Sequence, residues 1–298
     1  MFTKRTVGFA SLVAVTLVAF WAPLSMLARF SFQHEHYSHI ILIPLVSGSL
    51  LFLGRERIFA HAETRWRLGL GLLAGGALVY WFGQQHAAGA SANDQLSIAM
   101  CAVVVVWVAS FVLCYGTQAF RRGLFPMLFL FLMVPIPDAV LSRAIFWLQT
   151  GSAEVAGVLF ELVGVPVLRT GFTFALPGVT IEVAKECSGI RSSLVLLITS
   201  LLAGHLFLRS AWTKGVLALS TVPLLVVKNG IRIVTLSLLS VYVDPRFLTG
   251  SLHRDGGIVF FILALVILTP VMWALQRCEA GGTRAVAADL EVRASGPR

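Results

Sequence analysis

The sequence predicts an all-α integral membrane protein with about eight transmembrane helices, a small external β-hairpin and interfacial helices. The 298 residues are 57% hydrophobic and 12% charged, with a mean hydropathy of +0.86, so the chain lacks the polar residues that cover a soluble globule. The apolar residues also fall into runs near the ~20 residues that a helix needs to cross ~30 Å of hydrocarbon. The runs are 7–28, 37–54, 67–83, 96–115, 122–136, 188–208, 214–234 and 256–276.

The predicted membrane domain covers residues 1–278. Its first run follows Lys4 and Arg5, as in a signal peptide, but no small-residue cleavage site follows it, so we expect a retained helix. Residues 138–166 have a helical period interrupted by charges, which favours a helix packed at the interface over a further span. The tail 279–298 is rich in Ala, Gly and Arg and is predicted to be disordered in the cytoplasm.

The basic residues orient the chain. The formal net charge of +9 comes from residues in short loops between apolar runs, a pattern that sets membrane orientation and does not indicate a nucleic-acid partner. With the N-terminus in the cytoplasm, most of the 23 Lys and Arg residues lie on the inner side. Five of the nine outer exceptions lie within a few residues of Cys187, Arg232 or His253, and ionisable groups kept beside a membrane predict a functional site.

Cys187 is the candidate nucleophile of that site. It lies at the first turn of an apolar helix, between Lys185 and Arg191, and both cationic neighbours and the positive end of a helix favour the thiolate. Cys187 could instead be a small apolar residue that starts a span, with Ser188 as the N-cap. A permanent external disulfide, which only Cys101 could form, would also exclude a nucleophile.

Arg232 and His253 are predicted to lie at the same depth as Cys187. A guanidinium can stabilise an oxyanion or a thiolate, and an imidazole can transfer protons near neutral pH. His39, at the outer start of the second run, competes with His253 for the second role. Lys228 lies one helical turn before Arg232 in the same apolar run, and two such charges favour a polar cavity over snorkelling to the interface.

A β-hairpin is predicted just before Cys187. Residues 172–174 and 179–183 alternate apolar with polar side chains around the Leu-Pro-Gly turn at 176–178. Such a hairpin could form a wall over the site, offer an edge to an extended peptide, or be a plain connector.

Several motifs resemble those of the exosortase/archaeosortase family. They are 186–192 (ECSGIRS), 229–233 (NGIRI) and His253 ahead of a Gly-Gly pair, while 37–39 (YSH) and 135–137 (PIP) look like secondary features of that family. The resemblance covers roughly residues 37–261. The sequence departs from the family pattern at Ile40, where a glycine often follows the histidine.

The resemblance implies a membrane cysteine protease or transpeptidase with Cys187, Arg232 and His253 as catalytic residues. Its substrates would be exported proteins that carry a C-terminal signal, made of a short motif such as Pro-Glu-Pro, a membrane helix and a basic tail. The enzyme would cleave and transfer them through a thioester, in a bacterial inner membrane with the site on the periplasmic face. Such enzymes usually accompany exopolysaccharide production, and no cofactor or metal is expected.

We expect the acidic motif of the substrate to bind near Arg191, Lys228, Arg254 and His39, and membrane lipid to surround the spans. Two alternatives remain. The chain could be a non-enzymatic membrane component of an exopolysaccharide export system, or a serine-based intramembrane protease that uses Ser188 or Ser192.

Overall fold

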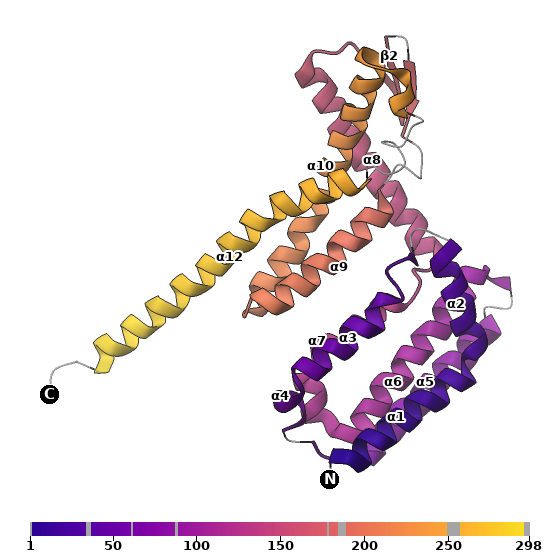
Figure 1. The fold of residues 1–298 in the computed structure, drawn as a ribbon, viewed down its shortest axis with the longest axis vertical. Coiled ribbons are helices and arrows are strands. Elements are labelled where there is room, and N and C mark those ends of the chain that lie inside the picture. The colour runs from indigo at the N-terminus through magenta and orange to yellow at the C-terminus, as the bar shows by residue number, and fades with distance from the viewer. Residues whose placement is uncertain are drawn as a thin grey trace. The chain divides into compact units, whose positions relative to one another are not determined.

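The computed structural model describes residues 2–33, 37–60, 62–86, 89–177, 179–183, 189–248 and 257–294. These residues are mostly helical, with one small β-sheet. The chain divides into two compact units, Met1–Ser142 and Arg143–Arg298 (Figure 1). Each unit buries apolar side chains of its own.

The first unit is built around α6 (Ala92–Arg122), whose side chains Met100, Val103 and Phe111 are fully buried. Helices α1, α2, α4 and α5 pack on it. The helical backbone of α6 is interrupted at Gly116, where φ is 84°, a conformation open to glycine without steric cost. The other helices of this unit are α1 (Phe2–Ala19), α2 (Trp21–Gln33), α3 (Leu42–Leu53), α4 (Arg55–Phe59), α5 (Trp66–His86), α7 (Leu124–Phe129) and the 3-10 helix η3 (Leu130–Met133).

Glycines allow α5 to lie close to α6. Gly69, Gly76 and Gly83 recur at heptad spacing, so they lie on one side of α5. A Cβ atom at Gly69 would lie 2.4 Å from Leu113 on α6, and one at Gly83 would lie 2.5 Å from Ile98. Close backbone approach through small residues is typical of helix pairs in membranes.

The second unit combines helices with the sheet. Helix α8 begins within the first unit and continues into the second. Helices α9, α10 and α12 pack on one another around Leu196, Leu217 and Ala264. The elements of this unit are α8 (Asp138–Val163), β1 (Leu168–Thr170), β2 (Thr173–Leu176), β3 (Val179–Glu182), α9 (Ile190–Phe207), α10 (Ala211–Tyr242), the 3-10 helix η5 (Pro245–Leu248) and α12 (Gly257–Ala294).

The sheet is antiparallel, in the order β1-β2-β3. The pairing of β2 with β3, with Thr173 opposite Glu182, confirms the predicted hairpin, and β1 is an additional short strand. Phe174 on β2 is fully buried in a cluster that includes Phe160 of α8 and Ile233 of α10. The sheet is therefore fixed to two helices, close to the point where β3 leads into Val183.

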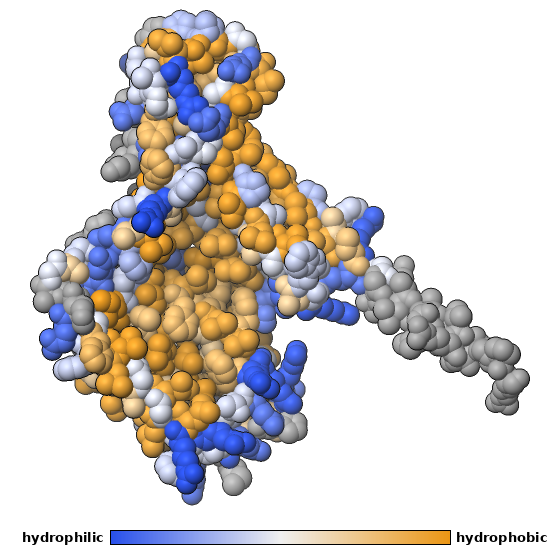
Figure 2. Space-filling model, turned by 180° about the vertical axis from the view of Figure 1, so that it is seen from behind, coloured by the Kyte–Doolittle hydropathy of each residue, from blue (hydrophilic) through white to orange (hydrophobic). Residues whose placement is uncertain are grey.

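Four helices are long and apolar enough to cross a membrane: α6, α9, α10 and the Gly257–Gly281 part of α12. Two bent helix pairs raise the number within the described ranges to six if each pair is one span. Many large apolar side chains are exposed, and Figure 2 shows apolar residues covering much of the visible helical surface. The chain is a multi-pass membrane protein, but the prediction of eight spans is not confirmed.

Several predicted runs differ from the structure in shape. Run 7–28 bends by 77° between α1 and α2, and a bend of 91° at the prolines of 135–137 separates 124–133 from α8. Helix α3 has 12 residues, about 18 Å at 1.5 Å per residue, which is too short for ~30 Å of hydrocarbon. The helical backbone of α12 extends to Ala294, and the predicted division between domain and tail at 278 stays a prediction.

Candidate functional site

Buried polar side chains gather where α8, α9 and α10 meet in the second unit. Lys228 and Asn229 on α10 are 2% and 1% exposed, and Ser152 on α8 is fully buried. Burying an ammonium or an amide in an apolar helix bundle is unfavourable unless the group is hydrogen-bonded. The partners of these residues therefore define the local structure.

Hydrogen bonds join these residues across the three helices. The Lys228 ammonium donates to Ser192 Oγ on α9, and the Ser192 hydroxyl donates to the Gly189 carbonyl over 3.0 Å. Asn229 Nδ2 donates to Ser152 Oγ, also over 3.0 Å. Ser152, Gly189, Ser192, Lys228 and Asn229 together form what we call the polar cluster.

Two glycines allow this close packing. A Cβ atom at Gly230 of α10 would lie 2.5 Å from Val155 Cγ1 on α8. Gly189, at the N-cap of α9, has a φ of 70°, and a Cβ atom there would lie 3.0 Å from Asn229 Oδ1 and 3.6 Å from Lys228 Nζ. Glycine at these positions lets the three backbones approach the polar groups directly.

The described residues that flank segment 184–188 are Gly189, which belongs to the polar cluster, and Val183, which contacts α8. Val183 is 1% exposed. Its N–H donates to the Phe172 carbonyl over 2.9 Å, and its own carbonyl accepts a hydrogen bond from Gln149 Nε2 on α8. The segment itself, which contains Cys187, lies outside the described residues, but the residues on either side of it are fixed to buried positions.

Arg232 and Arg191 bring further positive charge to this part of the second unit. Arg232 is half-buried on α10, one turn beyond Lys228, and Arg191 is exposed in the first turn of α9. Helix α10 has 32 residues, about 48 Å, so it is longer than the ~30 Å hydrocarbon layer. A span that starts at Ala211 reaches the opposite boundary about 20 residues later, close to Arg232.

The structure describes only some of the predicted site residues. Cys187, His253 and Arg254 lie outside the described residues, so their roles stay predictions. His39 is half-buried in the first unit. Lys228 was predicted to bind the acidic motif of the substrate; its side chain is buried and donates to the Ser192 hydroxyl of α9, and its role in substrate binding stays a prediction.

Sequence reasoning did not select Gln149 or Ser152. Gln149 was visible only as a polar interruption of an apolar run. Ser152 follows it by three residues, and both are buried on the same face of α8 as Ala153 and Ala156. A buried face of small and polar residues on a helix next to a candidate site was therefore the signal that could have found them.

An ion pair fixes the sheet to α8. Arg169 on β1 donates two hydrogen bonds, of 2.9 and 2.7 Å, to the two carboxylate oxygens of Glu154. These bonds raise the pKa of the Arg169 guanidinium, which therefore stays charged. The same guanidinium lies 5.6 Å from the centre of the Phe174 ring. The pair supports the position of the sheet and touches no predicted site residue.

A second hydrogen-bond network, in the first unit, surrounds the turn that carries His39. Tyr37 donates through its hydroxyl to Asn93 Oδ1 over 2.8 Å, and Asn93 Nδ2 donates to Asp138 Oδ1 over 2.7 Å. Asn93 lies in the first turn of α6, and Asp138 directly follows the proline segment 135–137. The two secondary motifs of the sequence are thus joined through one buried amide.

The remaining cysteines are free. Among the described residues, Cys101, Cys114 and Cys278 form no disulfide. Within the described parts of the chain, no group of three or more His, Cys, Asp or Glu side chains could hold a metal ion.

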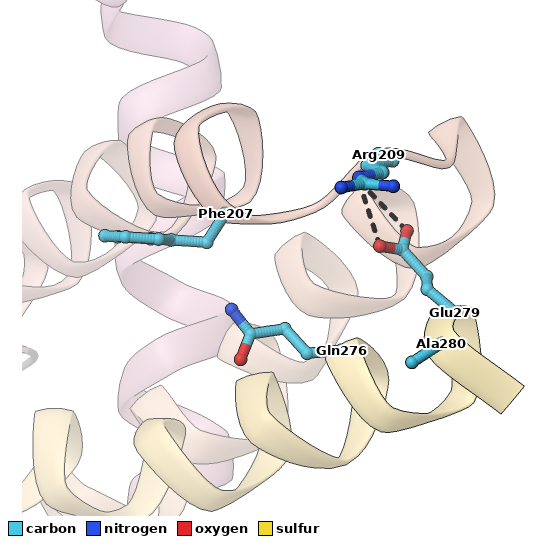
Figure 3. A pocket seen from close by; sticks show the side chains of 5 residues that line it. All are labelled: Phe207, Arg209, Gln276, Glu279 and Ala280. Carbon is cyan, nitrogen blue, oxygen red and sulfur yellow. Dashed lines mark hydrogen bonds between the residues drawn. The ribbon is translucent and has the colours of Figure 1, made fainter.

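A pocket of about 280 Å³ lies near the end of α9 (Figure 3). Its lining includes Arg209 and Glu279, and the Glu279 carboxylate accepts hydrogen bonds from the backbone N–H groups of Arg209 and Ser210 and from the Thr213 hydroxyl. A carboxylate at this place caps the first turn of α10. The pocket is therefore a structural junction between α12 and α10. The other lining residues are Phe207, Gln276 and Ala280.

The fold and this cluster define a helical, multi-pass membrane protein with charged and polar groups buried among its helices. Residues 27–270 match the family model described as transmembrane exosortase. The chain belongs to this family, which confirms the resemblance noted from its motifs. No curated protein and no solved structure matches the chain.

Proposed function

We propose that the protein is a cysteine transpeptidase that cleaves exported proteins at a C-terminal sorting signal and transfers them to an acceptor. It acts in a bacterial inner membrane, with its site on the periplasmic face. The observation that carries the proposal is the anchoring of Val183 and Gly189, the residues on either side of segment 184–188, by Gln149 and by the polar cluster. Reaction at a thiol needs a nucleophile held in place, and family membership favours this chemistry.

In the proposed reaction, the Cys187 thiolate attacks the carbonyl carbon of the scissile peptide bond. Arg232 stabilises the oxyanion of the tetrahedral intermediate. The C–N bond then breaks, and His253 donates the proton that the leaving amine requires. The product is a thioester on Cys187, and an acceptor amine or water attacks it to release the thiol.

Positive charge supports recognition of an acidic motif. Arg191 is exposed in the first turn of α9 and Arg232 is half-buried on α10. With Arg254 and His39, they would favour a carboxylate close to the scissile bond. The apolar helix of the substrate would lie among the spans, in contact with lipid-facing side chains.

The nucleophile is tested with a tagged substrate that carries a sorting signal, in cells that express Cys187→Ala, Cys187→Ser or Cys278→Ala. We expect both Cys187 variants to lose processing. Cys278 is an exposed free thiol in α12, so its variant serves as a matched control that keeps activity. Continued processing by Cys187→Ala would refute covalent catalysis, and it is the result expected of a non-enzymatic component of polysaccharide export.

The proton donor is tested by comparing His253→Ala with His39→Ala. Loss of processing in the first variant, with partial activity in the second, supports the assignment of His253. Full activity of His253→Ala contradicts it.

A second candidate follows from the hydrogen bond between Lys228 and Ser192. A lysine that accepts a serine proton can activate a serine nucleophile, so a Ser192–Lys228 pair could perform the same cleavage through an ester. The Ser192 hydroxyl donates its proton to the Gly189 carbonyl and not to Lys228, so the observed hydrogen bonds do not favour Ser192 as a nucleophile. Treatment with a thiol-selective alkylating reagent separates the two, because a serine enzyme keeps its activity.

A further inference from the structure

Lys228 is a buried cation that the proposed reaction does not use. It lies on an otherwise apolar stretch of α10 and is 2% exposed. Asn229, which follows it, turns to α8 and donates to Ser152. Retaining an ammonium at this position is unfavourable for packing alone, which points to a role in the site.

The contacts of Lys228 lead to the backbone beside the proposed nucleophile. Its ammonium donates to Ser192 Oγ, and the Ser192 hydroxyl donates to the carbonyl of Gly189. That carbonyl also accepts the first backbone hydrogen bond of α9, from Ser193 N–H over 2.9 Å. Two donors therefore fix the orientation of the Gly189 peptide group, and one of them depends on Lys228.

Gly189 brings the charge close to the segment. A Cβ atom at Gly189 would lie 3.6 Å from Lys228 Nζ, so the ammonium lies close to the Gly189 backbone. Cys187 is two residues from Gly189 along the chain. A positive charge close to a cysteine favours its thiolate.

We propose that Lys228 is a positioning residue, which holds the Gly189 peptide through Ser192 and keeps a positive charge beside the segment that carries the thiolate. This inference rests on the proposed function, because it assumes that Cys187 reacts as a thiolate. Arg232 lies one turn beyond Lys228 on α10, and Arg191 lies one residue before Ser192 on α9. On α8, Glu154 is already paired with Arg169.

The test measures the alkylation rate of Cys187 as a function of pH in the full-length protein, with mass spectrometry to identify the modified cysteine. Lys228→Met is expected to move the midpoint of the profile upward by about one pH unit and to slow substrate processing about tenfold near neutral pH. Lys228→Arg keeps the charge and should return the midpoint toward the original value. Lys214→Met, on the same helix, is the matched control and should change neither quantity.

Ser192→Ala provides an independent variant, because it removes the link to Gly189 and keeps the ammonium. We expect a smaller upward shift of the midpoint and several-fold slower processing. If Lys228→Met folds and its alkylation profile against pH is unchanged, the proposal is wrong. If Lys228→Met does not fold, an unchanged alkylation profile in Ser192→Ala overturns the proposal instead. Failure of the proposed function looks different: Cys187→Ala then processes the substrate, whatever the alkylation profile shows.

Discussion

Replacing one glycine of α10 tests the packing that forms the polar cluster. In the interior of a helix, Gly→Ala contributes about 1 kcal/mol of stability through helix propensity. At Gly230 the new Cβ atom would lie 2.5 Å from Val155 Cγ1, 2.9 Å from Val155 Cβ and 3.4 Å from the backbone nitrogen of Ala156. Overpacking of this kind costs about 1–3 kcal/mol, so Gly230→Ala is expected to be destabilising or at best neutral.

Gly215 offers a matched comparison on the same helix. A Cβ atom there meets no other atom within 4 Å, so Gly215→Ala keeps the propensity gain and should stabilise the protein. The difference between the two variants then isolates the overpacking cost of about 1–3 kcal/mol. Thermal unfolding of the purified protein in detergent measures both.

Val155→Ala supplies a partial rescue. It removes the methyl group 2.5 Å from the new Cβ atom but keeps Val155 Cβ at 2.9 Å, so it should recover part of the stability in the Gly230→Ala background while destabilising the original protein. Asn229 belongs to the polar cluster and directly precedes Gly230. Gly230→Ala without the Val155 substitution should therefore also process substrate more slowly. If Gly230→Ala stabilises the protein as much as Gly215→Ala does, the close contact between α8 and α10 is wrong.

Three further substitutions test other contacts by the same unfolding measurement. Gly189→Ala should lower the free energy of unfolding by about 1–2 kcal/mol because of the positive φ, and by a further amount because the new Cβ atom contacts Asn229. Gly164 also has a positive φ, of 73°, but a Cβ atom there meets no atom within 4 Å, so Gly164→Ala should show the backbone cost alone. Equal losses of stability in the two variants would contradict the contact between Gly189 and Asn229. Tyr37→Phe removes a buried hydrogen bond to Asn93 and should cost about 1–3 kcal/mol, and an unchanged melting temperature would place that hydroxyl in water. Glu279→Gln should weaken the cap of α10 and lower the melting temperature by less than Tyr37→Phe, because the carboxylate is solvent-exposed; a larger drop would mean that the cap carries more of the fold.

Hydropathy predicted spans that are single apolar helices in the structure. Runs 188–208, 214–234 and 256–276 correspond to α9, α10 and the first part of α12. It did not predict the bend after α1, because the apolar composition continues through residue 20 without a break. Strand β1 was missed because three residues are too few to show an alternating pattern.

For the candidate site, the sequence predicted where charge collects but not which way each side chain points. Two cations one turn apart on α10 indicated a polar cavity, and the structure describes a buried Lys228 that donates to Ser192. Its partner Ser192 depends on how α9 is rotated and shifted against α10, and that register is set by glycine contacts, which a single sequence does not reveal.

The bond between Lys228 and Ser192 also bears on how the protein enters its membrane. Taken alone, α10 carries a lysine, an asparagine and an arginine within an apolar stretch, so it is a poor candidate for insertion by itself. Helix α9 brings the acceptor for the lysine, and only residues 208–210 separate the two helices. The two helices are therefore expected to leave the insertion machinery as a pair, with the ammonium already shielded by its neighbour.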